Sequence, residues 1–292
     1  MTLTLLYRGP LASCNYDCSY CPFGKARHTP DELEQDRRAL GRLVQWVVAR
    51  EQPTDLLFTP WGEALIHRHY QDALVDLTRL PWVRRAAIQT NLSGSLDWLE
   101  RCDPGRIGIW ATYHPASTAR GRFLERCRQL HRRGVSFSVG VVGLREHFDE
   151  IDGLRRALPE QTYLWINAYK RDPDYYDPSD LDRLRAIDPL FSLNLWPHPS
   201  RGRACRAGHD VVAVDGEGAI RRCHFIDDPV GNLYHTDLGL QPAPAPCTVQ
   251  QCRCHIGYVH LVHLGLRELF GEGLLERALP GWRALAGREG RG

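Results

Sequence analysis

The chain has 292 residues, of which 43% are hydrophobic and 25% charged, and its formal net charge is +2. That length suits one large α/β domain, alone or with an appendage, and a sizeable buried core. A charge so close to neutral gives no electrostatic reason to expect nucleic acid or an acidic membrane surface as a partner. No apolar run reaches the roughly 18 residues of a membrane-spanning helix. Residues 1–6 read as a strand rather than as a signal peptide.

Two hydrophobic periodicities alternate along residues 1–190. Short apolar runs predict strands, and apolar stripes at helical spacing predict the helices between them. The strands are expected at residues 1–6, 55–59, 86–90, 107–112, 135–142 and 163–168. The helices are expected at residues 30–50, 70–79, 96–101, 118–133, 148–158 and 179–187. This alternation predicts a parallel sheet with right-handed crossovers, whose chemistry lies at the carboxyl ends of the strands.

Three cysteines, Cys14, Cys18 and Cys21, lie within eight residues of one polar loop after the first strand. Thiolates gathered this closely bind soft metal centres, and cysteine is the usual ligand of iron–sulfur clusters. Three ligands on a four-iron cube would leave one iron open, much as an open position distinguishes catalytic from structural zinc. A zinc knuckle completed by His28 and a redox-sensing thiol patch are the alternatives.

The spacing C-x3-C-x2-C, with Tyr20 before the third cysteine, resembles the signature of the radical S-adenosylmethionine (SAM) superfamily. In that family SAM chelates the open iron and is cleaved reductively to methionine and a 5′-deoxyadenosyl radical, which abstracts hydrogen from a substrate. The resemblance implies that Cys14, Cys18 and Cys21 ligate a [4Fe–4S] cluster and that Tyr20 lies against the SAM adenine. It also implies a partial, TIM-like (β/α)6 barrel over residues 1–190 and an electron donor of the flavodoxin or ferredoxin type.

The ends of the second and third strands resemble two further motifs of the family. Trp61-Gly62-Glu63 is similar to its Gly-Gly-Glu motif, with Trp61 in place of the first glycine. The likeness implies that Glu63 pairs with the SAM ammonium group. Thr90-Asn91 is similar to a pair that the family places near the SAM carboxylate or ribose.

Later strand ends supply candidates for the adenine, the ribose and the substrate. Val141 and Gly143 match part of the family's G-x-I-x-G-x-x-E adenine-binding motif. Tyr113 and His114 follow the fourth strand and are expected to face the cavity, where they would contact substrate or handle protons; an ordinary turn is the alternative. The polar residues suited to ribose or substrate contacts after the sixth strand are Asn167, Tyr169 and Lys170.

A second group of cysteines follows residue 190, where the alternation of strands and helices stops. Its members are Cys205, Cys223, Cys247, Cys252 and Cys254. A hairpin with a glycine-rich turn at 215–218 is predicted between Cys205 and Cys223, which brings both to one end. Five thiols compete for four positions on one centre. We favour the four without Cys247, although Cys247 is nearly as good a candidate as Cys205.

The C-x12-G-x4-C pattern of this hairpin resembles the start of the twitch and SPASM extensions of radical SAM enzymes, which hold auxiliary [4Fe–4S] clusters. The resemblance implies one auxiliary cluster in a short, twitch-like extension over residues 191–292 that ends in a helix. A structural zinc on four thiolates is the alternative. His260 and His263 are expected on one face of a helix across 256–264, packed rather than bound to metal.

These patterns together predict a cytoplasmic oxidoreductase. Ten cysteines in a chain of this size fit a reducing compartment better than a secreted disulfide scaffold. The enzyme is expected to bind SAM and a small-molecule or peptide substrate, in an oxidative modification or a biosynthetic step. The rival hypothesis is a non-enzymatic zinc or iron–sulfur protein that serves as a scaffold or redox sensor.

Overall fold

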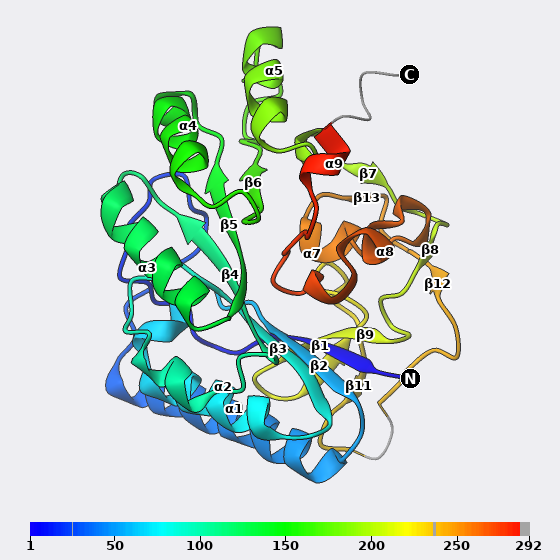
Figure 1. Cartoon of the computed structure of the whole chain (residues 1–292). Coiled ribbons are helices and arrows are strands. Elements are labelled where there is room, and N and C mark those ends of the chain that lie inside the picture. The colour runs from blue at the N-terminus through cyan, green and yellow to red at the C-terminus, as the bar shows by residue number, and fades with distance from the viewer. Residues whose placement is uncertain (25, 236–237, 287–292) are drawn as a thin grey trace.

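A nine-stranded sheet forms the centre of the computed structural model, which describes residues 1–24, 26–235 and 238–286 (Figure 1). Its strand order is β11-β10-β9-β1-β2-β3-β4-β5-β6. Neighbouring strands from β9 to β6 pair in parallel, whereas β10 and β11 pair antiparallel with their neighbours. The predicted α/β class is confirmed.

All six predicted strands are present in the first part of the chain. They are β1 (Leu3–Arg8), β2 (Thr54–Phe58), β3 (Val83–Thr90), β4 (Ile107–Tyr113), β5 (Ser136–Val142) and β6 (Leu164–Asn167). The helices are α1 (Pro30–Arg50), α2 (Arg68–Arg79), α3 (Arg120–Arg132), α4 (Phe148–Ala157), α5 (Pro178–Ile187) and α6 (Phe191–Leu195). Among the described residues, no helix has both the length and the apolar character that a membrane span requires.

One predicted helix, at 96–101, is instead a 3-10 helix over Asp97–Arg101. The apolar residues Leu96, Leu99 and Cys102 repeat every three positions, which is the period of a 3-10 helix rather than of an α-helix. These three side chains belong to, or pack against, the same hydrophobic cluster.

The later part of the chain adds short strands and helices. The strands are β7 (His198–Pro199), β8 (Ala204–Cys205), β9 (Val211–Asp215), β10 (Ala219–Arg221), β11 (Pro229–Asn232), β12 (Ala245–Pro246) and β13 (Gln251–Cys252). The helices are α7 (His255–Tyr258), α8 (Leu266–Phe270) and α9 (Arg283–Ala286). The predicted hairpin is β9–β10, and β9 pairs directly with β1. The predicted extension, whose residues 287–292 lie outside the described ranges, therefore shares one sheet with the predicted core.

The helix predicted across 256–264 is wrong. It is divided at Leu261, which is extended and forms an isolated bridge with Cys205. The helical period is therefore lost between the two histidines. His260 is buried and His263 is exposed, so the two imidazoles do not share a face.

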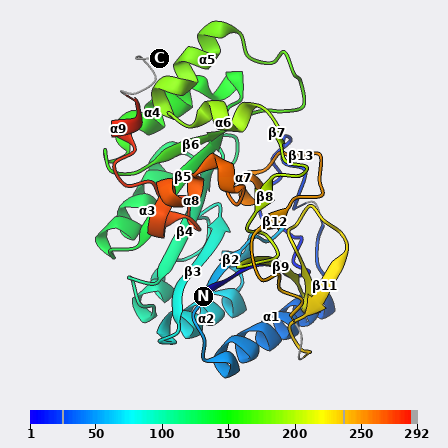
Figure 2. The same ribbon diagram turned by 90° about the vertical axis from the view of Figure 1, so that its right-hand side faces the viewer.

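Side chains along the sheet alternate between two hydrophobic clusters, as the two-residue period of a strand requires. The outer cluster packs the sheet against α1–α4 and includes Leu5, Leu56, Ile88, Ile109 and Ile166. The inner cluster includes Leu6, Leu57, Ala87, Trp110 and Trp165, together with Tyr258, Leu266, Phe270, Leu275 and Trp282 from the end of the chain. Figures 1 and 2 show α7 and α8 on the face of the sheet opposite α1–α4. The end of the chain thus fills part of the barrel interior.

Buried polar contacts fix this C-terminal segment inside the barrel. Glu276 Oε1 accepts a hydrogen bond from Ser136 Oγ at 2.6 Å, and Ser138 Oγ donates to the Glu276 carbonyl at 2.5 Å. Burial raises the pKa of Glu276. Because β5 begins at Ser136, the segment reaches the amino end of this strand, and the carboxyl ends of the strands stay open.

The inner packing predicts a large effect of one methyl group. A Cβ at Gly140 would lie 1.9 Å from Cζ2 of Trp165. We expect Gly140→Ala to lower the free energy of unfolding by about 3 kcal/mol, because the indole must move within a packed interior. In the control Gly41→Ala, on α1, nothing lies within 4 Å of the added Cβ, and we expect a gain of about 0.5–1 kcal/mol. Urea denaturation measures both; equal midpoints would contradict the contact of Trp165 with β5.

Candidate active site

A cavity of about 780 Å³ opens at the carboxyl ends of the strands, a volume typical of ligand sites. Residues 13–24 form the cysteine loop, which makes up part of the cavity wall, and the ends of β2, β3, β4 and β6 form another part. The remaining wall comes from late in the chain, chiefly from residues 253–256 and Arg277. Segments that are far apart in the sequence therefore meet around one space.

All three cysteines of the loop line this cavity. The sulfurs of Cys14 and Cys21 each accept a backbone N–H from two residues further along, at 3.4 Å. Cys18 Sγ lies 3.4 Å from His114 Nδ1 and 3.4 Å from Ser117 Oγ. Hydrogen bonds to sulfur tune the potential of iron–sulfur clusters, so these contacts suit such a cluster.

A single ion and a cluster make different demands on these sulfurs. Across the described ranges, no three Cys, His, Asp or Glu side chains converge so that one metal ion would be within reach of all of them. Zinc needs every ligand within about 2.3 Å, whereas a cube distributes its cysteines over separate irons. His28, the fourth ligand of the zinc alternative, instead accepts the Ala12 N–H at Nε2, at 2.7 Å. This contact ties the segment before the cysteine loop to the segment before α1.

The end of β2 is pressed against the cysteine loop at Gly62. A Cβ at this position would lie 1.8 Å from the Ser13 carbonyl oxygen, so a side chain has no room. The same carbonyl accepts the Glu63 N–H at 3.0 Å. Trp61, which replaces the first glycine of the motif, is 38% exposed, and the Arg8 guanidinium lies 4.3 Å from its ring centroid. The departure from the motif therefore leaves the Gly62 contact intact.

Glu63 joins the ends of β2 and β3. Its Oε1 accepts from Thr90 Oγ1 at 2.8 Å and from the Leu65 N–H at 3.0 Å, and its Oε2 accepts from the Asn91 N–H at 2.6 Å. Burial raises the pKa of Glu63, and these three hydrogen bonds oppose that rise. A carboxylate offers about four acceptor positions, so one remains for a further donor in the cavity.

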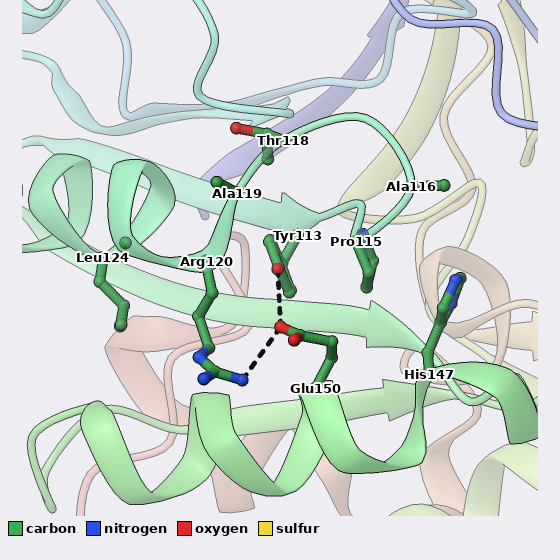
Figure 3. A pocket seen from close by; sticks show the side chains of 10 residues that line it. Tyr113, Pro115, Ala116, Thr118, Ala119, Arg120, Leu124, His147 and Glu150 are labelled. Atoms are coloured by element: carbon green, nitrogen blue, oxygen red, sulfur yellow. Dashed lines mark hydrogen bonds and ion pairs between the residues drawn. The ribbon is translucent and has the colours of Figure 1, made fainter.

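His114 lies in the cavity, but Tyr113 does not. His114 Nδ1 is 2.7 Å from the Tyr20 hydroxyl, and burial lowers the pKa of His114 to about 4. Successive residues of a strand point in opposite directions, and Tyr113 donates on the other side to Glu150, which also accepts from Arg120. These three residues line a separate pocket of about 600 Å³ (Figure 3). The expectation that Tyr113 faces the cavity is not met.

The remaining residues predicted to contact SAM also form two groups, those that line the cavity and those that do not. Tyr20, Thr90, Asn91 and Asn167 line the cavity. On β5, Val141 packs in the outer cluster, and Gly143 is not among the lining residues. The residue between them, Val142, lines the cavity instead. The alternation of the strand thus places Val141 away from the space where an adenine would bind.

The later cysteines gather near the β9–β10 hairpin. Cys205 is in β8, which pairs with β12, and Cys247 directly follows β12. Burial, followed by the charges of Cys205 and Cys247, raises the pKa of Cys223 to about 11. Burial, followed by the charges of Cys223, Cys254 and Cys205, raises the pKa of Cys252 to about 12. All five thiols are thus brought near one another.

Cys254 differs from the other four because it lines the large cavity. Its charge acts on Lys170 and Arg8, two cations of the cavity wall. Lys170 was among the polar residues predicted after the sixth strand. The patterns in the sequence did not single out Arg8, His224, His255 or Arg277 as site residues, and no local motif marks them.

Solved structures with this fold include two of anSMEcpe. The structure with bound AdoMet, which is SAM, is 15% identical, with a TM-score of 0.53 over 79% of this chain and 78% of that chain. The structure with AdoMet and the Cp18Cys peptide is 13% identical, with a TM-score of 0.52 over 80% and 78%. The likeness confirms the predicted partial TIM-like barrel. No protein-family model and no curated protein matches the sequence.

Proposed function

We propose that the chain is a radical SAM enzyme, in which Cys14, Cys18 and Cys21 hold a [4Fe–4S] cluster and SAM binds beside it. The observation that carries this proposal is the contact of Gly62 with the cysteine loop. It places three thiols and the carboxylate of Glu63 in one cavity, at the strand ends of a barrel shared with an AdoMet-binding enzyme. When bound and reduced, the cluster would supply the electron that cleaves SAM to the hydrogen-abstracting 5′-deoxyadenosyl radical.

The side chains of the chain have separate tasks in this proposal. Glu63 has one acceptor position left, which suits the SAM ammonium group. Tyr20, held by His114 at 2.7 Å, offers a ring for the adenine. His114 orients the Tyr20 hydroxyl and also lies 3.4 Å from the sulfur of Cys18, so it links these two residues.

The experiment is anaerobic purification followed by incubation with SAM and dithionite. We expect a brown protein that forms 5′-deoxyadenosine, detected by liquid chromatography and mass spectrometry. Colourless protein that carries zinc and leaves SAM intact would overturn the proposal in favour of a metal scaffold or redox sensor.

Replacing Glu63 tests the SAM site itself. We expect Glu63→Gln to raise the Kd for SAM about ten- to a hundredfold, because a hydrogen bond to a charged group contributes roughly 1.5–3 kcal/mol. Calorimetric titration of the cluster-bearing protein without reductant measures the change. The control is Glu160→Gln, which removes an exposed carboxylate that pairs with Arg283 at 3.2 Å. An unchanged Kd in Glu63→Gln would show that this carboxylate does not contact SAM.

The second group of cysteines belongs to the same proposal, as ligands of one auxiliary [4Fe–4S] cluster. Cys205, Cys223, Cys247 and Cys252 are the proposed set, because Cys254 lines the cavity instead. A cluster near the cavity could accept an electron from the substrate and make the reaction oxidative. The substrate is a small molecule or a peptide; anSMEcpe, which shares the fold, binds a peptide. A flavodoxin or ferredoxin would donate the first electron, in a cytoplasm that keeps the ten unbridged cysteines reduced.

A further inference from the structure

The cavity wall carries an excess of positive charge. Its cationic residues are Arg8, Lys170, Arg171, Arg253 and Arg277. Among the described lining residues, Glu63 is the only carboxylate, and three hydrogen bonds already occupy most of its acceptor positions. The cluster on three thiolates is anionic and SAM is cationic, so the two largely cancel. The positive charge of the cavity wall therefore requires another anion to balance it.

One of these cations, Arg277, lies deep in the barrel. Its guanidinium stands 4.4 Å from the ring centroid of Trp165 and 5.7 Å from that of Trp110. Trp110 lies within β4, about 13 Å of strand before His114, which follows β4 and contacts Tyr20 of the cysteine loop. The cavity floor, formed by Trp110, Trp165, His255 and Arg277, thus lies deeper in the barrel than the cysteine loop.

The Arg277 side chain is buried without an anionic partner. The residue is 3% exposed, and its Nε is enclosed with no hydrogen-bond acceptor. Within the described part of the chain, its guanidinium forms neither a hydrogen bond nor an ion pair. Asp188, the carboxylate on which its charge acts, accepts hydrogen bonds from three other groups. A guanidinium stays protonated in proteins, so this buried charge has Asp188 as a neighbouring carboxylate but, among the described residues, no acceptor for its own N–H groups.

The backbone at Arg277 is strained. Its φ of 55° lies in the left-handed region, which non-glycine residues rarely adopt. Such strain persists where the surrounding structure imposes it, often at ligand sites. The neighbouring Glu276 could neutralise the guanidinium, yet its carboxylate is turned to Ser136 at 2.6 Å and Arg85 at 3.7 Å. Glu276 is thus adjacent to Arg277 in the sequence, but its carboxylate contacts other partners.

Two other donors share this part of the cavity. His255 is 7% exposed, and its Nε2 is enclosed without a partner. Its ring stands edge-on to Trp110, with centroids 5.4 Å apart. Lys170 Nζ donates to Asn194 Oδ1 at 2.7 Å and to the Arg253 carbonyl at 3.0 Å, which leaves its third N–H unused. The cavity floor and Lys170 therefore offer several donors and no acceptor of matching charge.

We propose that the cavity floor binds an oxyanion of the substrate, a carboxylate or a phosphate, with Arg277 as its anchor. The planar fork of a guanidinium matches both groups. This inference rests on the proposed function, since it identifies the substrate as an anionic small molecule or a peptide with an acidic group. Bound at the floor, the oxyanion directs the rest of the substrate toward the cysteine loop.

The test uses the full chain with its clusters reconstituted. Sodium phosphate and sodium benzoate are titrated separately by calorimetry, with sodium chloride keeping the ionic strength constant. We expect at least one of them to bind, and Arg277→Met to weaken that binding tenfold or more. The matched control is Arg283→Met, which removes an arginine outside the cavity that pairs with Glu160. This variant should bind as the unaltered protein does.

Each outcome has a definite meaning. Binding of phosphate alone indicates a phosphate ester, binding of benzoate alone indicates a carboxylate, and loss of either in Arg277→Met supports the site. If neither anion binds more tightly than chloride, the proposal is overturned, because the cations then only balance the auxiliary thiolates. Equal affinity of the unaltered protein and of Arg277→Met also overturns it. If that variant fails to fold by circular dichroism, Arg277→Lys keeps the charge, lacks the fork and should still bind more weakly. SAM cleavage by the same wild-type preparation reports separately on the proposed function.

Discussion

Alanine in place of Cys18 is expected to reduce the formation of 5′-deoxyadenosine from SAM to background. Cys18 is the buried member of the cysteine loop, and its sulfur faces the cavity. A cube that loses one of its three thiolate ligands keeps only Cys14 and Cys21 from the loop, and His28 is held by the Ala12 amide. Iron analysis should show a loss of about four irons per chain, the content of one cube. Product analysis by mass spectrometry measures the lost activity.

The matched control for this change is Cys127→Ala. Cys127 is as buried as Cys18, but it packs in the outer cluster on α3, and burial raises the pKa of its thiol to about 12. A thiol of this kind is an inert hydrophobic group. We expect the control variant to keep its iron and its activity at some cost in stability. Full iron and full cleavage in Cys18→Ala would show that the cluster is bound elsewhere.

Much of the fold could be predicted because its signals are local. The helix predicted at 30–50 is α1, which begins at Pro30 and ends at Arg50, and Thr29 and Glu32 form a capping box at its start. Each parallel strand is buried on both faces, so it reads as a short apolar run. The break in the predicted helix at Leu261 was missed, because a β-bridge to Cys205 overrides the helical spacing there. No neighbouring residue in the sequence indicates that bridge.

The predicted site residues that line the cavity come mostly from short contiguous segments. The cysteine loop follows β1 and the Gly62-Glu63 turn follows β2, so the side chains within each segment stay together at one strand end. Tyr113 and Val141 are different, because a single residue along a strand decides which face of the sheet a side chain reaches. The position of Arg277 depends on the end of the chain folding back into the barrel, which no periodicity in that segment reveals.

The second large effect concerns the ligands of the auxiliary cluster. It is a contrast in iron content between Cys247→Ala and Cys254→Ala. We expect the first variant to lose about four irons per chain and the second to retain them. The backbone holds Cys247 beside the segment that leads into β8 and Cys205. The Cys247 N–H donates to the Arg203 carbonyl at 2.9 Å, and the Gly202 N–H donates to the Cys247 carbonyl at 2.9 Å. Cys254 lines the cavity instead. Iron analysis and electron paramagnetic resonance of the reduced proteins measure the contrast.

The two variants serve as controls for each other, because both remove a half-buried thiol from the same short segment. A general loss of folding would affect both, whereas loss of a ligand affects one. If Cys254→Ala lost the cluster and Cys247→Ala kept it, the set favoured from the sequence, with Cys205, Cys223, Cys252 and Cys254, would be restored. Cys254 would then be a cluster ligand rather than a free thiol of the cavity wall. With Cys247 as the fourth ligand, Cys254 instead stays beside Lys170 in the space where the substrate is proposed to bind.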